Sequence, residues 1–408
     1  MKDKQAKYPQ LRFKGFTDPW VQRNLGDLAE IVRGASPRPI QDPKWFDDSS
    51  EIGWLRISDV TEQNGRIHHL DQHISEAGQA KTRVLTEPHL LLSIAATVGK
   101  PLVNYVKTGV HDGFLIFMNP KFDLEFMFQW LESYRDKWSR YGQPGSQVNL
   151  NSDLVKNQSI SIPSMDEQQK LGEFFEKLDN LIAANQRKLD LLKEQKKGYL
   201  QKMFPKNGAK VPELRFAGFA DAWEQRKLSD GTNKIGDGLH GTPKYSEDGE
   251  VYFVNGNNLV NGQIVIMPET KRVTSNEQSK DDKALNESTI LMSINGTIGN
   301  LAWYRGENLM LGKSAAYIEV SDFDKKFIYA YLQTRPVKDY YLNSLTGTTI
   351  KNLGLKAIRN TNICTPTIDE QAKIGVLFQN LDKTITLHQR KLDLLKEQKK
   401  GFLQNMFV

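Results

Sequence analysis

The feature that most constrains this chain is an exact internal repeat. The residues QRKLDLLKEQKKG occur at 186–198 and again, letter for letter, at 389–401, an offset of 203. At the same offset YPQLRFKGFTDPWVQRNLGD (8–27) aligns with VPELRFAGFADAWEQRKLSD (211–230), and twelve of these twenty positions are identical. Self-similarity at a fixed offset is typical of a duplicated structural unit. The sequence therefore predicts two copies of one fold, related by a pseudo-two-fold internal repeat.

A third pair of matching segments, MDEQQKLGEFF (165–175) and IDEQAKIGVLF (368–378), opens a long polar stretch in each half. Between the matching segments the two halves diverge. Each half thus has the order leading segment, variable domain, long helix. The predicted boundaries are 1–163 for the leading segment and first variable domain, 164–204 for the first helix, 205–366 for a linker, the second leading segment and the second variable domain, and 367–408 for the second helix.

The two long stretches carry the apolar pattern of a coiled coil. Alternating steps of four and three residues from Leu171 and from Ile374 meet mainly apolar side chains over about five heptads, as an a/d seam requires. Two amphipathic helices packed on separate cores are the alternative, and the unbroken period favours the coiled coil. The predicted seam consists of Leu171, Phe175, Leu178, Ile182, Leu189 and Leu192 in the first helix and Ile374, Phe378, Leu381, Ile385, Leu392 and Leu395 in the second.

The connection after the first helix sets the direction of pairing. Only about six residues (205–210) separate this helix from the second leading segment, which leaves no return path for a parallel pair. An antiparallel pair is therefore predicted, with each helix about 40 residues, or roughly 60 Å, long. Asn185 and His388 are polar positions of the seam, and their predicted role is to set helix register rather than to catalyse or bind a metal.

The variable domains contain strand-like runs such as GFLIFMN and TILMSI, bounded by Gly and Asn turns, and one helical stretch each. They lack the regular strand–helix alternation of a doubly wound fold. The predicted fold class is α+β, with two globular domains joined by two long antiparallel coiled-coil helices.

The loops of these domains are rich in side chains that suit DNA. Arg, Lys, Gln and Asn form hydrogen bonds with base edges, and Ser, Thr and Gly-rich backbone suit phosphates. The loops 142–151 and 346–354 are favoured because both lie just before a long helix. The candidate DNA-contact residues are Arg33, Arg38, Lys100, Gln143, Ser146, Gln147, Asn149, His240, Lys244, Lys313, Thr348, Thr349 and Lys351.

The overall composition points to an anionic partner. A net charge of +6 and a pI near 9.0 favour nucleic acid first. The single cysteine, Cys364, excludes a disulfide framework and a Cys-based zinc site, and it fits a reducing cytoplasm. No apolar run approaches the roughly 18 residues of a membrane span, and MKDKQAKYPQLRF has no signal-peptide core. We therefore expect a cytoplasmic protein without a membrane partner.

Motifs for catalysis are missing from the sequence. GENLMLGKS (306–314) has five residues between its glycines where the phosphate-binding P-loop has four. The patterns HExxH, GxSxG and [DNS]-P-P-[YFW] do not occur, so no catalytic residue and no metal site are predicted. Three hypotheses remain: a DNA-recognition subunit, a stand-alone nuclease or methyltransferase, and a coiled-coil scaffold without a DNA role.

The repeated segments resemble a known family. The L-R-F-x-G-F segment, the S-I-x-x-T-x-G-[KN] segment, the P-x-x-D-E-Q helix start and the duplicated QRKLDLLKEQKKG together resemble the specificity (S) subunit of type I restriction–modification enzymes. The resemblance covers essentially the whole chain. Each short motif is weak alone, but the combination and its duplication are specific.

The resemblance implies a non-catalytic subunit that binds double-stranded DNA. Each variable domain would be a target recognition domain for one half of a bipartite target, and the helices would be conserved spacers that dock the methyltransferases. Two modification (M) subunits would carry S-adenosylmethionine and methylate adenine, and two restriction (R) subunits would use ATP, so no cofactor is expected in this chain. The DNA-facing candidates it implies are the loops around Lys100, 143–149 and 346–351.

Overall fold

The computed structural model describes residues 8–94, 97–141, 150–206, 208–349 and 351–408. The candidates Gln143, Ser146, Gln147 and Asn149 lie outside these residues. The chain divides into two compact units, and each is described by itself: unit 1 contains Met1–Gln186 and Lys391–Val408, and unit 2 contains Arg187–Arg390.

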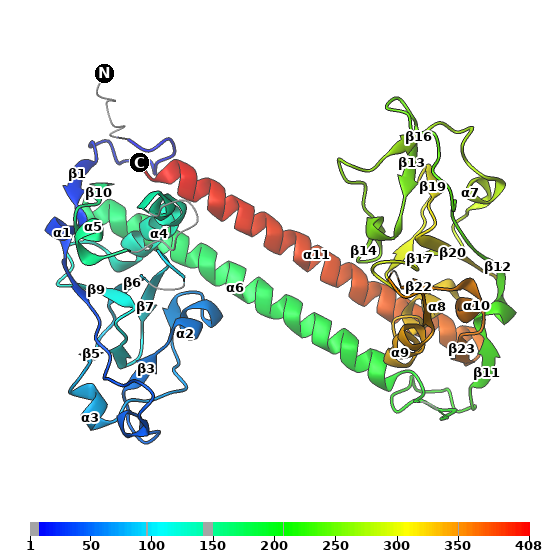
Figure 1. Ribbon diagram of the computed structural model, residues 1–408, viewed down its shortest axis with the longest axis horizontal. Coiled ribbons are helices and arrows are strands. Elements are labelled where there is room, and N and C mark those ends of the chain that lie inside the picture. Colours follow the sequence, from blue (N-terminus) through cyan, green and yellow to red (C-terminus); the bar gives the residue numbers. More distant parts are fainter. Residues whose placement is uncertain (1–7, 95–96, 142–149, 207, 350) are drawn as a thin grey trace. The chain divides into compact units, whose positions relative to one another are not determined.

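The two predicted long helices are α6 (Met165–Lys202) and α11 (Ile368–Met406), coloured green and red in Figure 1. Their bounds lie within two residues of the predicted ones. The division into units falls inside the repeated segment, so each helix contributes one part to each unit. Each compact unit therefore combines parts that are distant in the chain.

In unit 1 the first part of α6 packs against the last part of α11. The rings of Phe175 and Phe407 lie 5.7 Å apart, and one turn further along α6 the Asp179 carboxylate is 2.5 Å from the Lys399 ammonium. Rising residue numbers in α6 meet falling numbers in α11, which confirms the antiparallel direction within this unit. The seam residues of unit 1 are all buried or half-buried: Leu171, Phe175, Leu178, Ile182, Leu392 and Leu395.

Unit 2 repeats this arrangement with the other helix ends. The Lys196 ammonium is 2.6 Å from the Asp382 carboxylate, and the rings of Phe204 and Phe378 lie 5.6 Å apart. The direction is again antiparallel. The seam residues of this unit are also buried or half-buried: Leu189, Leu192, Ile374, Phe378, Leu381 and Ile385.

The variable domain of unit 1 contains a main sheet of strand order β2-β9-β6-β7-β4 and a small sheet of order β3-β8-β5. A further pair, β1-β10, lies next to α1, α5 and the start of α6 (Figure 1). The elements are β1 (Val21–Asn24), α1 (Leu25–Leu28), β2 (Glu30–Arg33), η1 (Pro43–Trp45), β3 (Gly53–Leu55), α2 (Ile57–Glu62), β4 (Arg66–Ile67), α3 (Glu76–Gln79), β5 (Arg83–Leu85), β6 (Leu90–Ser93), β7 (Pro101–Asn104), β8 (Thr108–Val110), β9 (Phe114–Met118), α4 (Leu124–Tyr134), η2 (Arg135–Tyr141), α5 (Ser152–Lys156) and β10 (Ser159–Ile162).

The main sheet of unit 1 is covered on both faces, which explains its nearly continuous apolar strands. Leu90 and Leu92 of β6 face a core that includes α4, Phe175 of α6 and Phe407, which follows the end of α11. Leu91, between them, faces the opposite core, which includes the small sheet. The unit is thus built in layers of small sheet, main sheet and helices.

Unit 2 has a four-stranded main sheet of order β12-β20-β17-β18, which matches β2-β9-β6-β7 of unit 1 without the edge strand β4, and a small sheet of order β16-β13-β19. Its strands β17 and β20 also alternate between a core shared with α8, α6 and α11 and a core shared with the small sheet. The elements are β11 (Glu224–Lys227), η3 (Leu228–Gly231), β12 (Thr232–Asp237), β13 (Val251–Val254), η4 (Gly256–Asn258), β14 (Leu259–Val260), β15 (Gln263–Ile264), β16 (Arg272–Val273), α7 (Lys280–Ala284), β17 (Thr289–Ser293), β18 (Leu301–Trp303), β19 (Leu309–Leu311), β20 (Ala315–Val320), α8 (Lys325–Tyr331), α9 (Arg335–Asn343), β21 (Leu345–Thr346), β22 (Asn352–Leu353), α10 (Leu355–Arg359) and β23 (Asn362–Thr365).

The two units therefore confirm the predicted α+β repeat, and they differ at the edges of their sheets. In unit 1, strand β5 adds to β8 as an edge strand. In unit 2 the strand equivalent to β8, which is β19, is followed on that side by helix α7 instead. There the Asp282 carboxylate accepts the N–H of Leu311 at 2.9 Å, so a side chain replaces a strand as hydrogen-bond partner.

Candidate nucleic-acid interface

The candidate interface of unit 1 is built where β2 leaves the main sheet. β2 pairs with β9 up to Arg33. The next residue, Gly34, donates its N–H to the carbonyl of Phe114 at 2.9 Å, and Ala35 donates to the carbonyl of Val110 at 3.0 Å. These bonds fix the strand end beside the short turn that joins β8 to β9.

Asp112, in that turn, is the centre of a polar cluster. Its carboxylate lies 2.6 Å from the Arg38 guanidinium and accepts the Ser36 hydroxyl at 2.8 Å, while its carbonyl accepts Arg33 Nε at 2.6 Å. Arg83 of β5 donates Nε to the Arg33 carbonyl at 2.8 Å. Burial alone would raise the pKa of Asp112, but the Ser36 hydrogen bond and the neighbouring positive charges lower it below its ordinary value. The carboxylate is therefore ionised at neutral pH and holds the Arg38 guanidinium in place.

Unit 2 builds the same strand end with different side chains. β12 pairs with β20 up to Asp237. Gly238 donates its N–H to the carbonyl of Ala315 at 3.1 Å, and the following N–H bonds the carbonyl of Leu311 at 2.7 Å. The turn beside this strand end, between β19 and β20, contains the exposed Lys313.

Both glycines are required because the backbones come very close. A Cβ atom on Gly34 would lie 2.2 Å from the carbonyl oxygen of His111, and one on Gly238 would lie 2.0 Å from that of Leu311. Real Cβ contacts are never this short, so a side chain here would push the strand end away from the turn. A glycine directly after a strand-like run is a signal for such a close approach.

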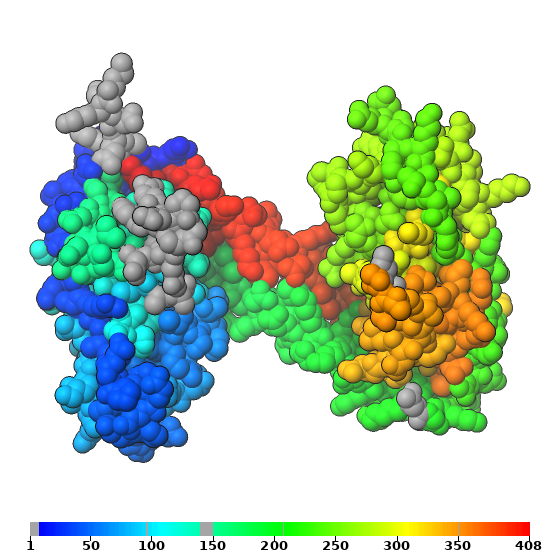
Figure 2. Space-filling model, in the orientation of Figure 1, coloured from blue at the N-terminus to red at the C-terminus, as the bar shows by residue number. Residues whose placement is uncertain are grey.

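Two more loops of unit 2 join this edge through backbone hydrogen bonds. Ile294, in the S-I-x-x-T-x-G loop, donates its N–H to the carbonyl of Ser314 at 2.9 Å, and its own carbonyl accepts the N–H of Leu353 at 2.8 Å. The exposed candidates Thr348, Thr349 and Lys351 lie in or beside the connection between β21 and β22, whose surface is orange in Figure 2. The S-I-x-x-T-x-G loop therefore lies between the turn of Lys313 and the β21–β22 pair and is hydrogen-bonded to both.

The remaining candidates lie in other surroundings. His240 Nε2 is 2.8 Å from the Asp237 carboxylate, beside the same strand end. Lys244 is exposed, but its N–H bonds the Glu277 carboxylate and the next residue pairs with β16, which places it beside the small sheet. Lys100 is half-buried, and burial lowers its pKa, although the charge of Glu132 opposes this change.

The sequence did not indicate Asp112, Ser36 or Asp237 as parts of the interface. An acidic residue among basic ones carries no signal in a single sequence, because most charged residues are simply solvated. Only the pairing of the strand end with the turn brings these side chains to the cations. Among the residues that the structure describes, no group of three His, Cys, Asp or Glu side chains is arranged to hold a metal ion. In the same residues, no helix is long and apolar enough to cross a membrane.

Comparison with known proteins identifies the repeat. The family described as "Type I restriction modification DNA specificity domain" matches residues 17–194 and again 220–397. The chain belongs to this family. Both matches include a recognition domain and most of the following long helix.

Curated relatives span nearly the whole chain. The MjaX type I restriction enzyme specificity subunit of Methanocaldococcus jannaschii is 22% identical over 437 residues, covering 98% of this chain and 95% of that protein. The MjaIX specificity subunit of the same organism is 23% identical, covering 95% and 92%.

Solved structures match the fold. The S subunit of a type I restriction–modification system from M. genitalium has a TM-score of 0.65 at 14% identity, covering 98% of this chain and 99% of that one. A structure described as showing complex assembly and conformational transition of the type I R-M system has a TM-score of 0.50 at 16% identity, covering 95% and 98%.

In this specificity protein the repeated segments join each recognition domain to its helix. Arg12 of the first L-R-F segment makes two 2.7 Å hydrogen bonds to the Glu167 carboxylate, and Arg215 makes the same two bonds to Glu370. The glutamate side chains are only 1% and 0% exposed. The P-x-x-D-E-Q glutamate therefore holds the leading segment by a buried, bidentate ion pair.

The glutamine of the same motif connects the long helix to the helix of the recognition domain. Gln168 Oε1 accepts the N–H of Asp123, which caps α4, at 3.1 Å, and Gln371 Oε1 accepts that of Asp324, which caps α8, at 3.0 Å. Both side-chain amides also donate to the carbonyl of the motif's proline. The proline, glutamate and glutamine of the repeated motif thus have equivalent partners in both units.

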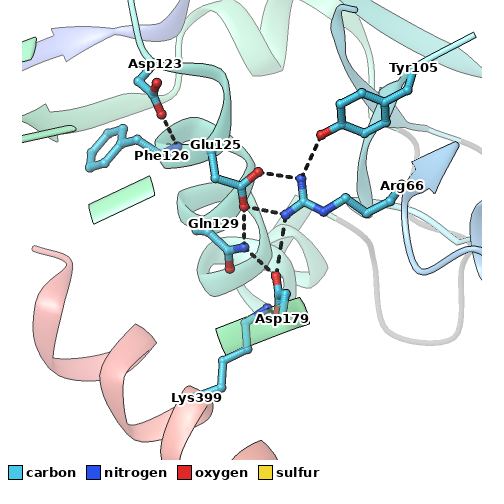
Figure 3. Close-up of polar contacts among 8 residues, drawn as sticks. All are labelled: Arg66, Tyr105, Asp123, Glu125, Phe126, Gln129, Asp179 and Lys399. Atoms are coloured by element: carbon cyan, nitrogen blue, oxygen red, sulfur yellow. Dashed lines mark hydrogen bonds and ion pairs between the residues drawn. The ribbon is translucent and has the colours of Figure 1, made fainter. Parts of the chain in front are cut away.

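A charged network extends this joint in unit 1 (Figure 3). Arg66 of β4 forms a bidentate ion pair with Glu125 of α4. Gln129 Nε2 donates to Glu125 at 2.8 Å and to Asp179 of α6 at 2.7 Å, and Asp179 also pairs with Lys399 of α11. The network ties a strand of the main sheet, the recognition-domain helix and both long helices together.

Unit 2 keeps the core of this network. Lys196 lies 2.6 Å from Asp382 and donates to Gln333 Oε1 at 2.6 Å. Lys196 and Lys399 are separated by the repeat offset of 203 residues and are both seam positions of the heptad pattern. Asp179 and Asp382 are separated by the same offset. The half-buried lysines of the seam are therefore neutralised by repeat-related aspartates.

Proposed function

We propose that this chain is the sequence-specific DNA-recognition subunit of a type I restriction–modification complex. Each recognition domain would bind one half of a bipartite target. The observation that carries the proposal is the repeated frame with unlike side chains at its strand ends. A recognition subunit for two different half-sites requires this combination, because the frame is shared while the contact residues differ.

The chemistry is assigned to partner subunits. We infer that two modification subunits bring S-adenosylmethionine and methylate the DNA, and that two restriction subunits use ATP and Mg²⁺. This chain would then supply recognition without catalysis. The identical surface of the two QRKLDLLKEQKKG segments supports two equivalent docking sites: Leu191 is 62% exposed and its counterpart Leu394 is 59% exposed. Exposed leucines at repeat-related positions suit binding of two copies of the same partner.

The long helices would set the length of the unspecified spacer between the half-sites. α6 has 38 residues, which corresponds to about 57 Å of helix. One added heptad in 166–200, together with one in 369–403, should lengthen the spacer and leave both half-sites unchanged. Altered half-sites with an unchanged spacer would refute this role of the helices.

Methylome sequencing tests the proposal as a whole. A host that expresses this chain with its methyltransferase partner should acquire methylation at a bipartite motif. A continuous motif, or no methylation, would count against it.

Purified protein separates the other hypotheses. Modification or cleavage of DNA by the chain alone, with S-adenosylmethionine or Mg²⁺, would favour a stand-alone enzyme. Binding of a specific duplex with steep salt dependence would exclude a scaffold without a DNA role.

A further inference from the structure

The strand ends of the two recognition domains are equivalent residue by residue. Arg33 is the last paired residue of β2, and Asp237 is the last paired residue of β12. Each is followed by the closely packed glycine and by the same two backbone bonds. The turns that receive these bonds also correspond, because each has three residues between its strands. Asp112 and Lys313 are the middle residues of the two turns.

At these equivalent positions the charges are exchanged. The first domain has a basic strand end, Arg33, and an acidic turn, Asp112, whereas the second has an acidic strand end, Asp237, and a basic turn, Lys313. In the first domain the acid of the turn holds Arg38, which lies five residues after the strand end. In the second domain the acid of the strand end contacts a histidine.

The element at the edge beside each turn also differs in charge between the two domains. In the first domain β5 contributes Arg83, whose guanidinium bonds the carbonyl of the strand end. In the second domain α7 contributes Asp281, which accepts the Tyr317 hydroxyl at 2.7 Å and pairs with Lys234. The edge of the first domain therefore concentrates arginines, and the edge of the second domain combines acids with single lysines.

Arg38 has the geometry of a residue that contacts a base. Its side chain is 75% exposed, and only Nη2 is engaged, by Asp112, which fixes the direction of the side chain. Among the described residues, none accepts a hydrogen bond from its Nε or Nη1. A guanidinium with free, oriented donors matches the two acceptors on the major-groove edge of guanine. Lys313 is likewise exposed, and no described residue bonds its ammonium.

We propose that Arg38 and Lys313 are the specificity-determining residues of the two recognition domains, each contacting a guanine in its own half-site, and that Asp112 positions Arg38. This inference rests on the proposed function and names the residues that carry it. Because the charges are exchanged, the base-contacting cation would follow the strand end in the first domain and would lie in the turn in the second. The two half-sites would therefore differ although the frame is the same.

The test uses the full chain in complex with its methyltransferase partner. Binding is measured on duplexes in which each base of the target is replaced in turn. R38A should weaken binding of the native duplex about 5- to 150-fold and abolish discrimination at one G·C pair of one half-site. K313A should do the same at one pair of the other half-site. K44A, at an exposed lysine paired with Asp42, is the matched control and should change neither.

D112N distinguishes positioning from direct contact. D112N keeps the shape of the side chain and should weaken discrimination at the same base pair as R38A. The double variant R38A/D112N should lose no more discrimination than R38A alone. If R38A instead weakens binding of every duplex equally and lowers the salt dependence of binding, Arg38 contacts a phosphate and the inference is overturned. An unchanged base preference in R38A would also overturn it. If the wild-type complex recognises no bipartite target, the proposed function itself fails.

Discussion

The joints between recognition domain and helix differ sharply from the strand ends that carry the candidate interface. At the joints, Arg12 and Arg215 bind Glu167 and Glu370 with the same atoms and the same distances. At the strand ends, equivalent positions carry Arg33 in one domain and Asp237 in the other. The duplicated frame is retained where it supports the domain and differs where we propose that it contacts DNA.

The largest expected effect comes from breaking the joints. R12A and R215A each leave a buried carboxylate without its partner, which costs about 3 kcal/mol of unfolding free energy. Urea unfolding should give similar losses for the two variants because their geometries match. R335A, at an exposed arginine paired with Asp339 one turn away, is the control and should cost less than about 0.5 kcal/mol. Losses that differ widely between R12A and R215A would contradict the equivalence of the joints.

Changes at the strand-end glycines should be smaller and confined to one domain. G34A and G238A each force a methyl group into a carbonyl oxygen, and overpacking of this kind costs about 1–3 kcal/mol. G34A should impair recognition of one half-site and G238A of the other, as base-substituted duplexes would reveal. G198A is the matched control: a Cβ there contacts nothing within 4 Å, so a slight gain in stability is expected. Loss of both half-sites in G34A would argue against independent domains.

The smallest effect is expected from the different neighbours of the two seam lysines, Glu132 beside Lys399 and Gln333 beside Lys196. Burial raises the pKa of Glu132 above its ordinary value, although Lys399 opposes this shift. A carboxyl with a raised folded pKa stabilises the protein at low pH, and this stability is lost as the pH rises from the ordinary to the raised value. Unit 2 has the neutral Gln333 at this position. E132Q should therefore flatten the fall in unfolding free energy with pH and stabilise the protein by less than about 1 kcal/mol at neutral pH.

Urea unfolding from about pH 4 to pH 8 would measure this difference between E132Q and the wild type. Q333E is the reciprocal variant and should introduce a pH dependence of the same sign through unit 2. Parallel curves for wild type and E132Q would contradict the assignment to Glu132.

Much of the frame was predictable from one sequence because its determinants are local or repeated. The heptad pattern predicted α6, α11 and the seam, and the short connection after Lys202 predicted their antiparallel direction. The ends of the seam were less predictable. Phe175 and Phe378 belong to the cores of the recognition domains as well as to the helix pair, so the two alternatives for the helices are both partly realised.

The candidate interface was predictable only in its cations. Arg33 and Arg38 were identified by residue type, but Asp112, which orients them, lies 76 residues from Ser36 and 74 residues from Arg38 in the sequence. Such a cluster depends on strand register, and no local pattern encodes it. The 143–149 candidates stay a prediction, as does the role in DNA binding of each named residue.

The most direct test of the central claim is methylome sequencing after exchange of residues 28–160 for the corresponding segment of a relative with a different target. Because the joints and helices stay the same, we expect a new bipartite motif in which one half-site changes while the other half-site and the spacer length are retained. A motif in which both halves change, or in which neither changes, would contradict the claim that each recognition domain binds its own half of the target.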